Sequence, residues 1–158
     1  MSSETIVTAL FLIAAVVAAG VLINAIFPVI SRTTETFGSV SHTADTQIRT
    51  DIKIVNEFAN SSESQIWLKN IGTARIPKND LDDSDIFFGN SGNFGVVSGA
   101  ALYPLGSNPG WWNPGETLLV VIKQNQVPPS RWPSSGNMTY FAIVLPNGVK
   151  RSIEFVAD

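Results

Sequence analysis

The segment that most constrains the fold of this chain is an uncharged run near its amino terminus. Between Thr5 and Ser31 there is no Asp, Glu, Lys or Arg, and residues 6–30 read IVTALFLIAAVVAAGVLINAIFPVI. A helix over these 25 residues would be about 37 Å long, which is enough to cross a hydrocarbon core of roughly 30 Å. Such a helix is apolar on every face, so it suits lipid or a protein-filled centre better than a soluble surface.

A cleaved secretory signal is the alternative interpretation of this run. Such a signal has a basic first region and an apolar core of about 7–15 residues. Here Ser2, Ser3 and Glu4 precede the run without any Lys or Arg, and the run is longer than that core. We therefore expect a retained helix rather than a signal that is removed.

The helical pattern continues beyond the uncharged run. Apolar residues recur at spacings of seven, three, four and four, at Ile30, Phe37, Val40, Ala44 and Ile48. This stripe predicts a continuous helix from about Thr5 to Thr46, loosened at Pro28 and weakened at Gly38. Residues 1–47 are thus expected to form one hydrophobic helix, and residues 48–158 a separate domain.

The second part of the chain predicts a series of short strands separated by turns. Candidate strands, recognised by alternation and by Gly or Pro boundaries, cover residues 51–58, 65–71, 85–88, 94–97, 101–105, 117–123, 139–145 and 149–156. Asn147-Gly148 between the last two is the strongest short-range hairpin signal. The predicted fold class is α+β, mainly β: a long hydrophobic helix followed by an antiparallel, immunoglobulin-like β-sandwich of about 110 residues.

Composition excludes several function classes. The 13 acidic and 10 basic residues give a net charge of -3 without a basic cluster, so nucleic acid is not an expected partner. The chain has no cysteine, which excludes a disulfide scaffold and a thiolate zinc site, and its one histidine lies on the predicted helix, where no Ser/His/Asp triad is credible. It carries no glycine-rich phosphate motif. We expect no catalytic residue, no cofactor and no small-molecule substrate.

One acidic stretch is a weak candidate for a cation site. Four carboxylates, Asp80, Asp82, Asp83 and Asp85, lie within six residues, and oxygen ligands at this density could hold Ca²⁺. The stretch lacks the central Gly and the closing Glu of an EF-hand loop. We expect a solvated loop, with the cation site as the alternative.

Three tryptophans are candidates for a partner interface. Trp111 and Trp112 lie between two Pro-Gly pairs at 109–110 and 114–115, and Trp132 lies in a similar Pro-rich segment. Adjacent residues of an extended chain point to opposite sides, so Trp111 and Trp112 cannot both face a core. Each of the three either caps the sandwich or, if exposed, anchors a partner, since Trp is enriched at binding hot spots.

The side of the membrane on which the β-domain lies is indicated by two opposing signals. Arg32 is the nearest flanking cation, and the positive-inside rule would place the domain in the cytoplasm. Two N-glycosylation sequons, at Asn60 and Asn137, and the Ser/Thr/Asn-rich β composition favour the extracellular side. We expect an extracellular domain in the cell envelope.

The opening SSETIVTALFLIAAVVAAGVLINAIFPVI, with its single Glu before the apolar run, resembles the start of type IV pilin-like proteins. Together with TFGSVSHTADTQIRTDIKIV and the segment 67–72 (WLKNIG), it is similar to the archaellum stator protein G (FlaG) family. The resemblance implies a non-catalytic component of the archaeal swimming organelle, anchored by its helix. It also implies a sandwich between the membrane and the S-layer, acting with the related stator protein F.

The resemblance leaves two arrangements of the helix open. In a stator subunit the helix lies in the membrane, whereas in an archaellin or type IV pilus subunit the helices bundle in the filament core. Close helix packing needs small residues, which the run supplies at Ala14, Ala15, Ala18, Ala19 and Gly20. Glu4 matches the acidic residue that pilins keep near the helix start, and is equally suited to an interfacial position. Self-association is expected in both arrangements.

Overall fold

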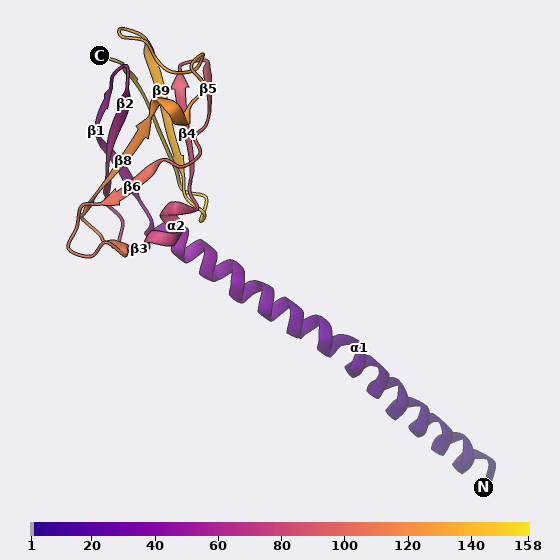
Figure 1. Ribbon diagram of the computed structural model, residues 1–158. Helices are drawn as coiled ribbons and strands as arrows, with labels where there is room; N and C mark the ends of the chain where they lie inside the picture. Colours follow the sequence, from indigo (N-terminus) through magenta and orange to yellow (C-terminus); the bar gives the residue numbers. More distant parts are fainter. Residues whose placement is uncertain (1) are drawn as a thin grey trace. The chain divides into compact units, whose positions relative to one another are not determined.

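A computed structural model describes residues 2–158 of the chain. The chain separates into two compact units, one up to Thr43 and the other from Ala44 to Asp158. Figure 1 shows their elements, a long helix and a β-domain, each of which is described here by itself. The last six residues of the helix, Ala44–Arg49, belong to the second unit.

Helix α1 extends over Ser2–Arg49 and is continuous through Pro28. The predicted helix is therefore confirmed, and it begins before Thr5 and ends after Thr46. Glu4 in the first turn and Arg49 in the last turn both complement the helix dipole. Met1, with which the predicted first domain begins, lies outside the described residues.

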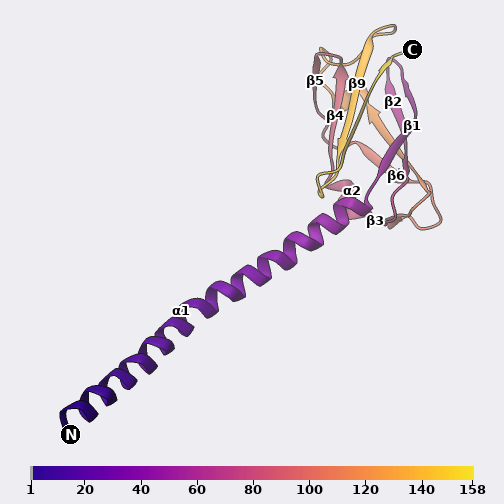
Figure 2. The ribbon, with the colours of Figure 1, turned by 180° about the vertical axis from the view of Figure 1, so that it is seen from behind.

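The β-domain consists of two four-stranded antiparallel sheets packed face to face, which confirms the predicted sandwich (Figures 1 and 2). The first sheet has the order β1-β2-β8-β6, formed by Ile52–Ala59, Glu63–Asn70, Thr117–Lys123 and Ala101–Pro104. The second sheet has the order β10-β9-β4-β5, formed by Lys150–Val156, Met138–Val144, Asp85–Asn90 and Asn93–Val96. Each of the predicted strand ranges overlaps one of these strands.

The core lies between the two sheets and follows the period-two alternation of the strands. In the first sheet β2 contributes Ile66 and Leu68, and β8 contributes Val120 and Ile122. The second sheet contributes large buried side chains that include Phe88, Phe141 and Ile143. The predicted hairpin between β9 and β10 is confirmed: Gly148 occupies the turn with φ +84°, and its N–H donates to the Leu145 carbonyl.

Several short elements were not predicted. Strands β3 (Ile76–Pro77) and β7 (Trp111–Trp112) form a two-stranded sheet, and α2 (Lys78–Asp82) and the 3₁₀ helix η1 (Gln124–Gln126) are short helical turns. The acidic stretch expected to be a loop begins inside α2. Leu81 is fully buried and fixes this turn against the core, whereas the sequence-based prediction considered only the polar residues around it.

Candidate assembly surfaces

The apolar surface of α1 is exposed along its length. From Ser3 to Thr43 every residue except the half-buried Ser31 is exposed, and Phe11, Val16 and Phe27 are 73%, 72% and 69% exposed. The predicted assembly residues Glu4, Ala14, Ala15, Ala18 and Gly20 all lie on this surface. By length and composition the helix can cross a membrane. Its apolar side chains therefore need lipid or other chains around them.

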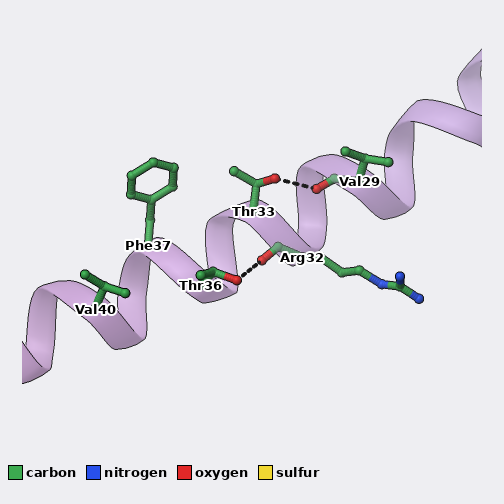
Figure 3. A pocket seen from close by; sticks show the side chains of 6 residues that line it. All are labelled: Val29, Arg32, Thr33, Thr36, Phe37 and Val40. Carbon is green, nitrogen blue, oxygen red and sulfur yellow. Dashed lines mark hydrogen bonds between the residues drawn. The ribbon is translucent and has the colours of Figure 1, made fainter.

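Many hydroxyl groups of α1 are bonded to the helix itself. Ser and Thr side chains donate to a backbone carbonyl three or four residues earlier at Thr8, Ser31, Thr33, Thr34, Thr36, Ser39 and Thr43. Figure 3 shows two of these bonds in a shallow depression that Val29, Phe37 and Val40 also border. After Ile30 the helix surface therefore carries apolar side chains next to Ser and Thr hydroxyls whose hydrogen bonds are already made within the helix.

The end of α1 is held by the loop that follows β2. The carbonyl of Arg49 accepts from the N–H groups of Thr73 and Ala74, at 2.9 and 3.0 Å. The carbonyl of Asp51 accepts from Ile71 and Gly72, at 2.9 and 3.0 Å. A Cβ at Gly72 would overlap the Arg49 carbonyl oxygen and lie 2.5 Å from the Asp51 nitrogen. Only glycine therefore allows this loop to approach the helix end.

Trp112 is part of the core, so the prediction that it contacts a partner is wrong. Its side chain is fully buried, and its indole Nε1–H donates to the Glu116 carbonyl at 2.9 Å. The Asn70 side-chain amide, also fully buried, donates to the Trp112 carbonyl at 3.2 Å. Pairing of Ile76 with Trp112 in the β3–β7 sheet turns this indole inward.

Trp132 is likewise a core residue, and its predicted interface role is also wrong. It is 6% exposed, its ring centroid lies 5.3 Å from that of Phe88, and its Nε1–H donates to the Asn60 carbonyl at 3.0 Å. Buried Trp side chains normally find such a partner for the indole N–H. A partner chain cannot reach this ring in the folded domain.

Among the three predicted tryptophans, Trp111 remains available as an interface candidate. It is half-buried, and the guanidinium carbon of Arg75 lies 4.4 Å from its ring centroid. A polar groove in the same region is lined by Arg49, Arg75, Asn113 and Pro114, among others. Arg49 in this groove forms an ion pair with Asp45, at 3.6 Å, and its Nε donates to Thr73 Oγ1 at 3.4 Å.

A carboxylate orders the loop that carries the two tryptophans. Glu116 Oε2 accepts from the backbone N–H of Asn113 at 3.0 Å and from its side-chain amide at 3.1 Å. These two hydrogen bonds, the backbone one first, together with the backbone of Ser107, hold the pKa of Glu116 below its ordinary value. The ionised form of Glu116 is therefore the one that ties the loop together.

The four carboxylates of the acidic stretch do not converge. Asp80 and Asp82 lie in α2, Asp83 caps its carboxyl end and Asp85 begins β4. Asp82 pairs with Lys78. Within residues 2–158 no three His, Cys, Asp or Glu side chains are grouped so that they could hold a metal ion. The structure thus assembles no cation site from these residues.

The two sequons occupy different surroundings. In the turn between β1 and β2, Asn60 Oδ1 accepts from the N–H groups of Ser62 and Glu63, at 2.8 and 2.9 Å, and Ser62 is exposed. Asn137 is exposed, but Thr139 of the same sequon is fully buried in β9, and its hydroxyl is buried without a hydrogen-bond partner. Glycosylation at either Asn stays a prediction.

Sequence reasoning did not identify Asn70, Gly72, Arg75 and Glu116 as positions that organise the domain. Each acts through a contact between segments distant along the chain or through a backbone group, and no local pattern reports such contacts. Gly72 did carry a signal, since a glycine directly after a predicted strand marks a turn or a close approach of two backbones.

A long apolar amino-terminal helix joined to an antiparallel two-sheet sandwich defines the architecture of pilin-like proteins. The archaeal-type flagellin family profile matches residues 2–155, and the chain belongs to this family. An uncharacterised protein of Archaeoglobus fulgidus is 28% identical over 98% of this chain and 99% of its own.

Solved structures from the archaellum share this fold. The periplasmic stator protein FlaG from Sulfolobus acidocaldarius is 23% identical, with a TM-score of 0.53 over 67% of this chain and 99% of that chain. The periplasmic stator complex of FlaF and FlaG from the same organism is 24% identical, with a TM-score of 0.52 over 66% of this chain and 87% of that chain. The archaeal flagellum of Methanospirillum hungatei is 16% identical, with a TM-score of 0.72 over 96% of this chain and 92% of that chain.

Proposed function

We propose that this chain is a non-catalytic, membrane-anchored stator subunit of the archaellum. The observation that carries the proposal is the apolar surface of α1, which is exposed from Ser3 to Thr43 apart from the half-buried Ser31. A single helix of this length and apolarity can anchor a protein in lipid. The archaeal-type flagellin family and the likeness to the periplasmic stator FlaG of S. acidocaldarius support the assignment to this organelle.

The division of α1 supports an anchor with a spacer. The uncharged run ends at Ser31, and Arg32–Arg49 adds about 27 Å of more polar helix at 1.5 Å per residue. In this proposal the sandwich lies outside the cell, between membrane and S-layer. The related stator protein F, as in the S. acidocaldarius complex, and other copies of this chain are the proposed partners.

A filament subunit is the second candidate function. The M. hungatei flagellum structure covers 96% of this chain, so its similarity includes α1 as well as the sandwich. In that arrangement Glu4 and the small residues Ala14, Ala15, Ala18 and Gly20 would pack against neighbouring helices rather than lipid. A buried Glu4 would then need a positively charged partner.

The two functions differ in where the full-length protein is found. Cells carrying an epitope-tagged chain are sheared to release filaments, and the filament and membrane fractions are compared by immunoblotting. A stator subunit stays with the membrane and is needed for swimming but not for filament formation. Recovery in sheared filaments would establish the filament function instead. Normal swimming and normal filaments after deletion of the gene would reject both.

A further inference from the structure

The outer face of the second sheet is unusually apolar for a surface that water would cover. Antiparallel sheets normally present polar residues on the face that is turned away from the core. Here the outward positions of β9, β4 and β5 are occupied, apart from Asp85 and Gly89, by Met138, Tyr140, Val144, Phe87, Phe94, Val96 and the fully buried Ala142. We call this surface the β9–β4–β5 face; Figures 1 and 2 show these strands side by side.

The register places these side chains in rows across the sheet. The central row runs Ser152, Ala142, Phe87 and Val96 from β10 to β5. The next row contains Glu154, Tyr140, Gly89 and Phe94. The row on the other side contains Lys150, Val144 and Asp85. The charged residues of the face are Lys150 and Glu154 on β10 and the exposed Asp85 at the start of β4.

Two aromatic rings pack against each other across Gly89 in the row beside the central one. Gly89 lies between Tyr140 and Phe94 in the register, and the two ring centroids are 4.2 Å apart; a Cβ at Gly89 would meet the backbone of Asn93, Phe94 and Arg131. Aromatic residues across a sheet glycine are a recognised way to shield it. The two rings are tilted by 31°, with Phe94 exposed and Tyr140 half-buried at the surface of the sheet.

The face exposes more apolar area than isolated surface residues do. Phe94, Val96 and Met138 are 43%, 56% and 46% exposed, and Val156, which pairs with Met138, is 55% exposed. Together they leave on the order of 300 Å² of apolar surface, the size at which a contiguous patch is often functional.

Two of the three charged residues on the face, Lys150 and Glu154 of β10, are placed so that two copies can pair them with each other. Lys150 and Glu154 are both exposed on β10, one row on either side of Ser152. If a second copy is placed face to face, with a two-fold axis along the central row, β10 lies antiparallel to its counterpart. Lys150 of each copy then lies against Glu154 of the other, the central row covers itself and Val144 covers Tyr140, while the exposed Asp85 at the start of β4 lies over the other copy's Gly89. The two Lys150–Glu154 contacts supply the self-complementarity that an isologous interface requires.

The outer face of the first sheet has an apolar row but lacks this charge pattern. The row contains Trp67, Leu119 and Tyr103, with Asn56 at its β1 end. On one side of it Lys53 pairs with Lys69, and on the other side Phe58 pairs with Gln65. The same two-fold operation would therefore place both lysines against uncharged residues.

The geometry points to the β9–β4–β5 face as the surface on which two copies of this chain dimerise, with paired Lys150–Glu154 contacts. The expected dimer is weak when the sandwiches diffuse freely. Sheets pack about 10 Å apart, and four short strands bury less than the roughly 800 Å² per partner of a standard interface. Confinement of the helices in one membrane raises the effective concentration of the second copy. The inference rests on the proposed function to this extent: an anchored subunit gains most from a weak face-to-face contact.

Charge reversal tests the inference on the full-length chain in detergent micelles. Lys150→Glu and Glu154→Lys, separately, should each weaken the dimer about tenfold in analytical ultracentrifugation, because symmetry repeats every changed contact. The double variant restores opposite charges in the same two positions and should recover the wild-type affinity to within about threefold. Lys69→Glu on the first sheet is the matched control and should leave the dimer unchanged.

The double variant also controls for a contact within the chain. Glu154 Oε1 accepts from the Ser91 hydroxyl at 2.8 Å, and Glu154→Lys removes this hydrogen bond as well as the charge. Because the double variant lacks the bond too, recovery of the dimer in that variant assigns the effect of the single reversals to charge between the copies.

Chemical cross-linking gives an independent measurement, because the chain has no cysteine of its own. Ser152→Cys lies on the proposed axis and should give a cross-linked dimer with a bis-maleimide that spans the distance between packed sheets. Lys69→Cys should not. Absence of the Ser152→Cys product, or single reversals that do not weaken the dimer, would overturn the inference. The proposed function would survive if the chain remained in the membrane and swimming still required it.

Discussion

At the residue scale, adjacent tryptophans have opposite surroundings because a two-residue strand turns one inward and the other outward. Trp112 fills the end of the core, and Trp111 lies under Arg75 at the surface. Trp112→Ala should reduce the free energy of unfolding by about 3–5 kcal/mol, since it removes a buried aromatic side chain. Chemical denaturation of the full chain in micelles measures this loss.

Trp111→Ala is the paired variant and should behave differently. The change removes a half-buried ring and one cation–π contact, so we expect a loss of about 1 kcal/mol or less in stability. Assembly or swimming should be impaired if Trp111 contacts a partner. Normal swimming with Trp111→Ala would limit the interface to other surfaces, such as the β9–β4–β5 face.

The second prediction at this scale concerns acid sensitivity. The pKa of Glu116 is lowered in the folded chain, so its ionised form adds stability above the ordinary carboxyl pKa, and this stability is lost as the pH falls through the folded value. Glu116→Gln should therefore be less stable than wild type at neutral pH, and the difference should shrink on acidification below a pH of about 4. Urea midpoints at both pH values test this expectation. If the difference in urea midpoint between Glu116→Gln and wild type were the same at both pH values, the effect of the substitution would come from packing and not from the charge.

At the element scale, the end of α1 is the contact that depends most on a single residue. Gly72→Ala places a Cβ on the Arg49 carbonyl and should break the hydrogen bonds of Arg49 and Asp51, at a cost of several kcal/mol. Gly38→Ala is the control: a Cβ there has nothing within 4 Å, and the helix should gain about 1 kcal/mol. Thermal melting of both variants distinguishes a steric effect from loss of glycine in general.

The elements that local patterns specify were predicted well, and those that distant contacts specify were not. Alternation identified β8 at Thr117–Lys123 with its observed bounds, and Asn147-Gly148 identified the β9–β10 hairpin. The β3–β7 sheet exists because Ile76 and Trp112 meet across the fold, which no period reveals. For the same reason the sequence could not decide between the capping and the interface alternatives for Trp112 and Trp132. The apolar β9–β4–β5 face becomes visible only when the register is known.

At the scale of the whole molecule, the sandwich should fold without the apolar run. Deleting residues 1–31 leaves Ala44–Asp158, the compact unit that contains the described core, together with a short polar helical segment. We expect this variant to stay soluble without detergent and to melt cooperatively, whereas the full chain requires detergent or lipid. Size-exclusion chromatography and circular dichroism provide the measurements.

A longer deletion is the control for that experiment. Removing residues 1–51 also removes the carbonyls of Arg49 and Asp51 and the Thr50 hydroxyl, which accepts from Asn147 at 2.9 Å. This variant should be clearly less stable than the shorter deletion. Equal stability would show that the helix end contributes little to the fold.

The hydroxyls bonded within α1 have a consequence for how the molecule is held. A serine or threonine whose hydroxyl is already bonded to its own helix loses little on leaving water, so the hydroxyls of Ser31–Thr43 contribute little to the polar limit of the anchor. The limit is set instead by the charges of Arg32 and Glu35, which follow the uncharged run directly, because a charged side chain in hydrocarbon is costly. A pull that draws the helix one turn further into the membrane would bury both charges, so the anchor resists displacement in that direction.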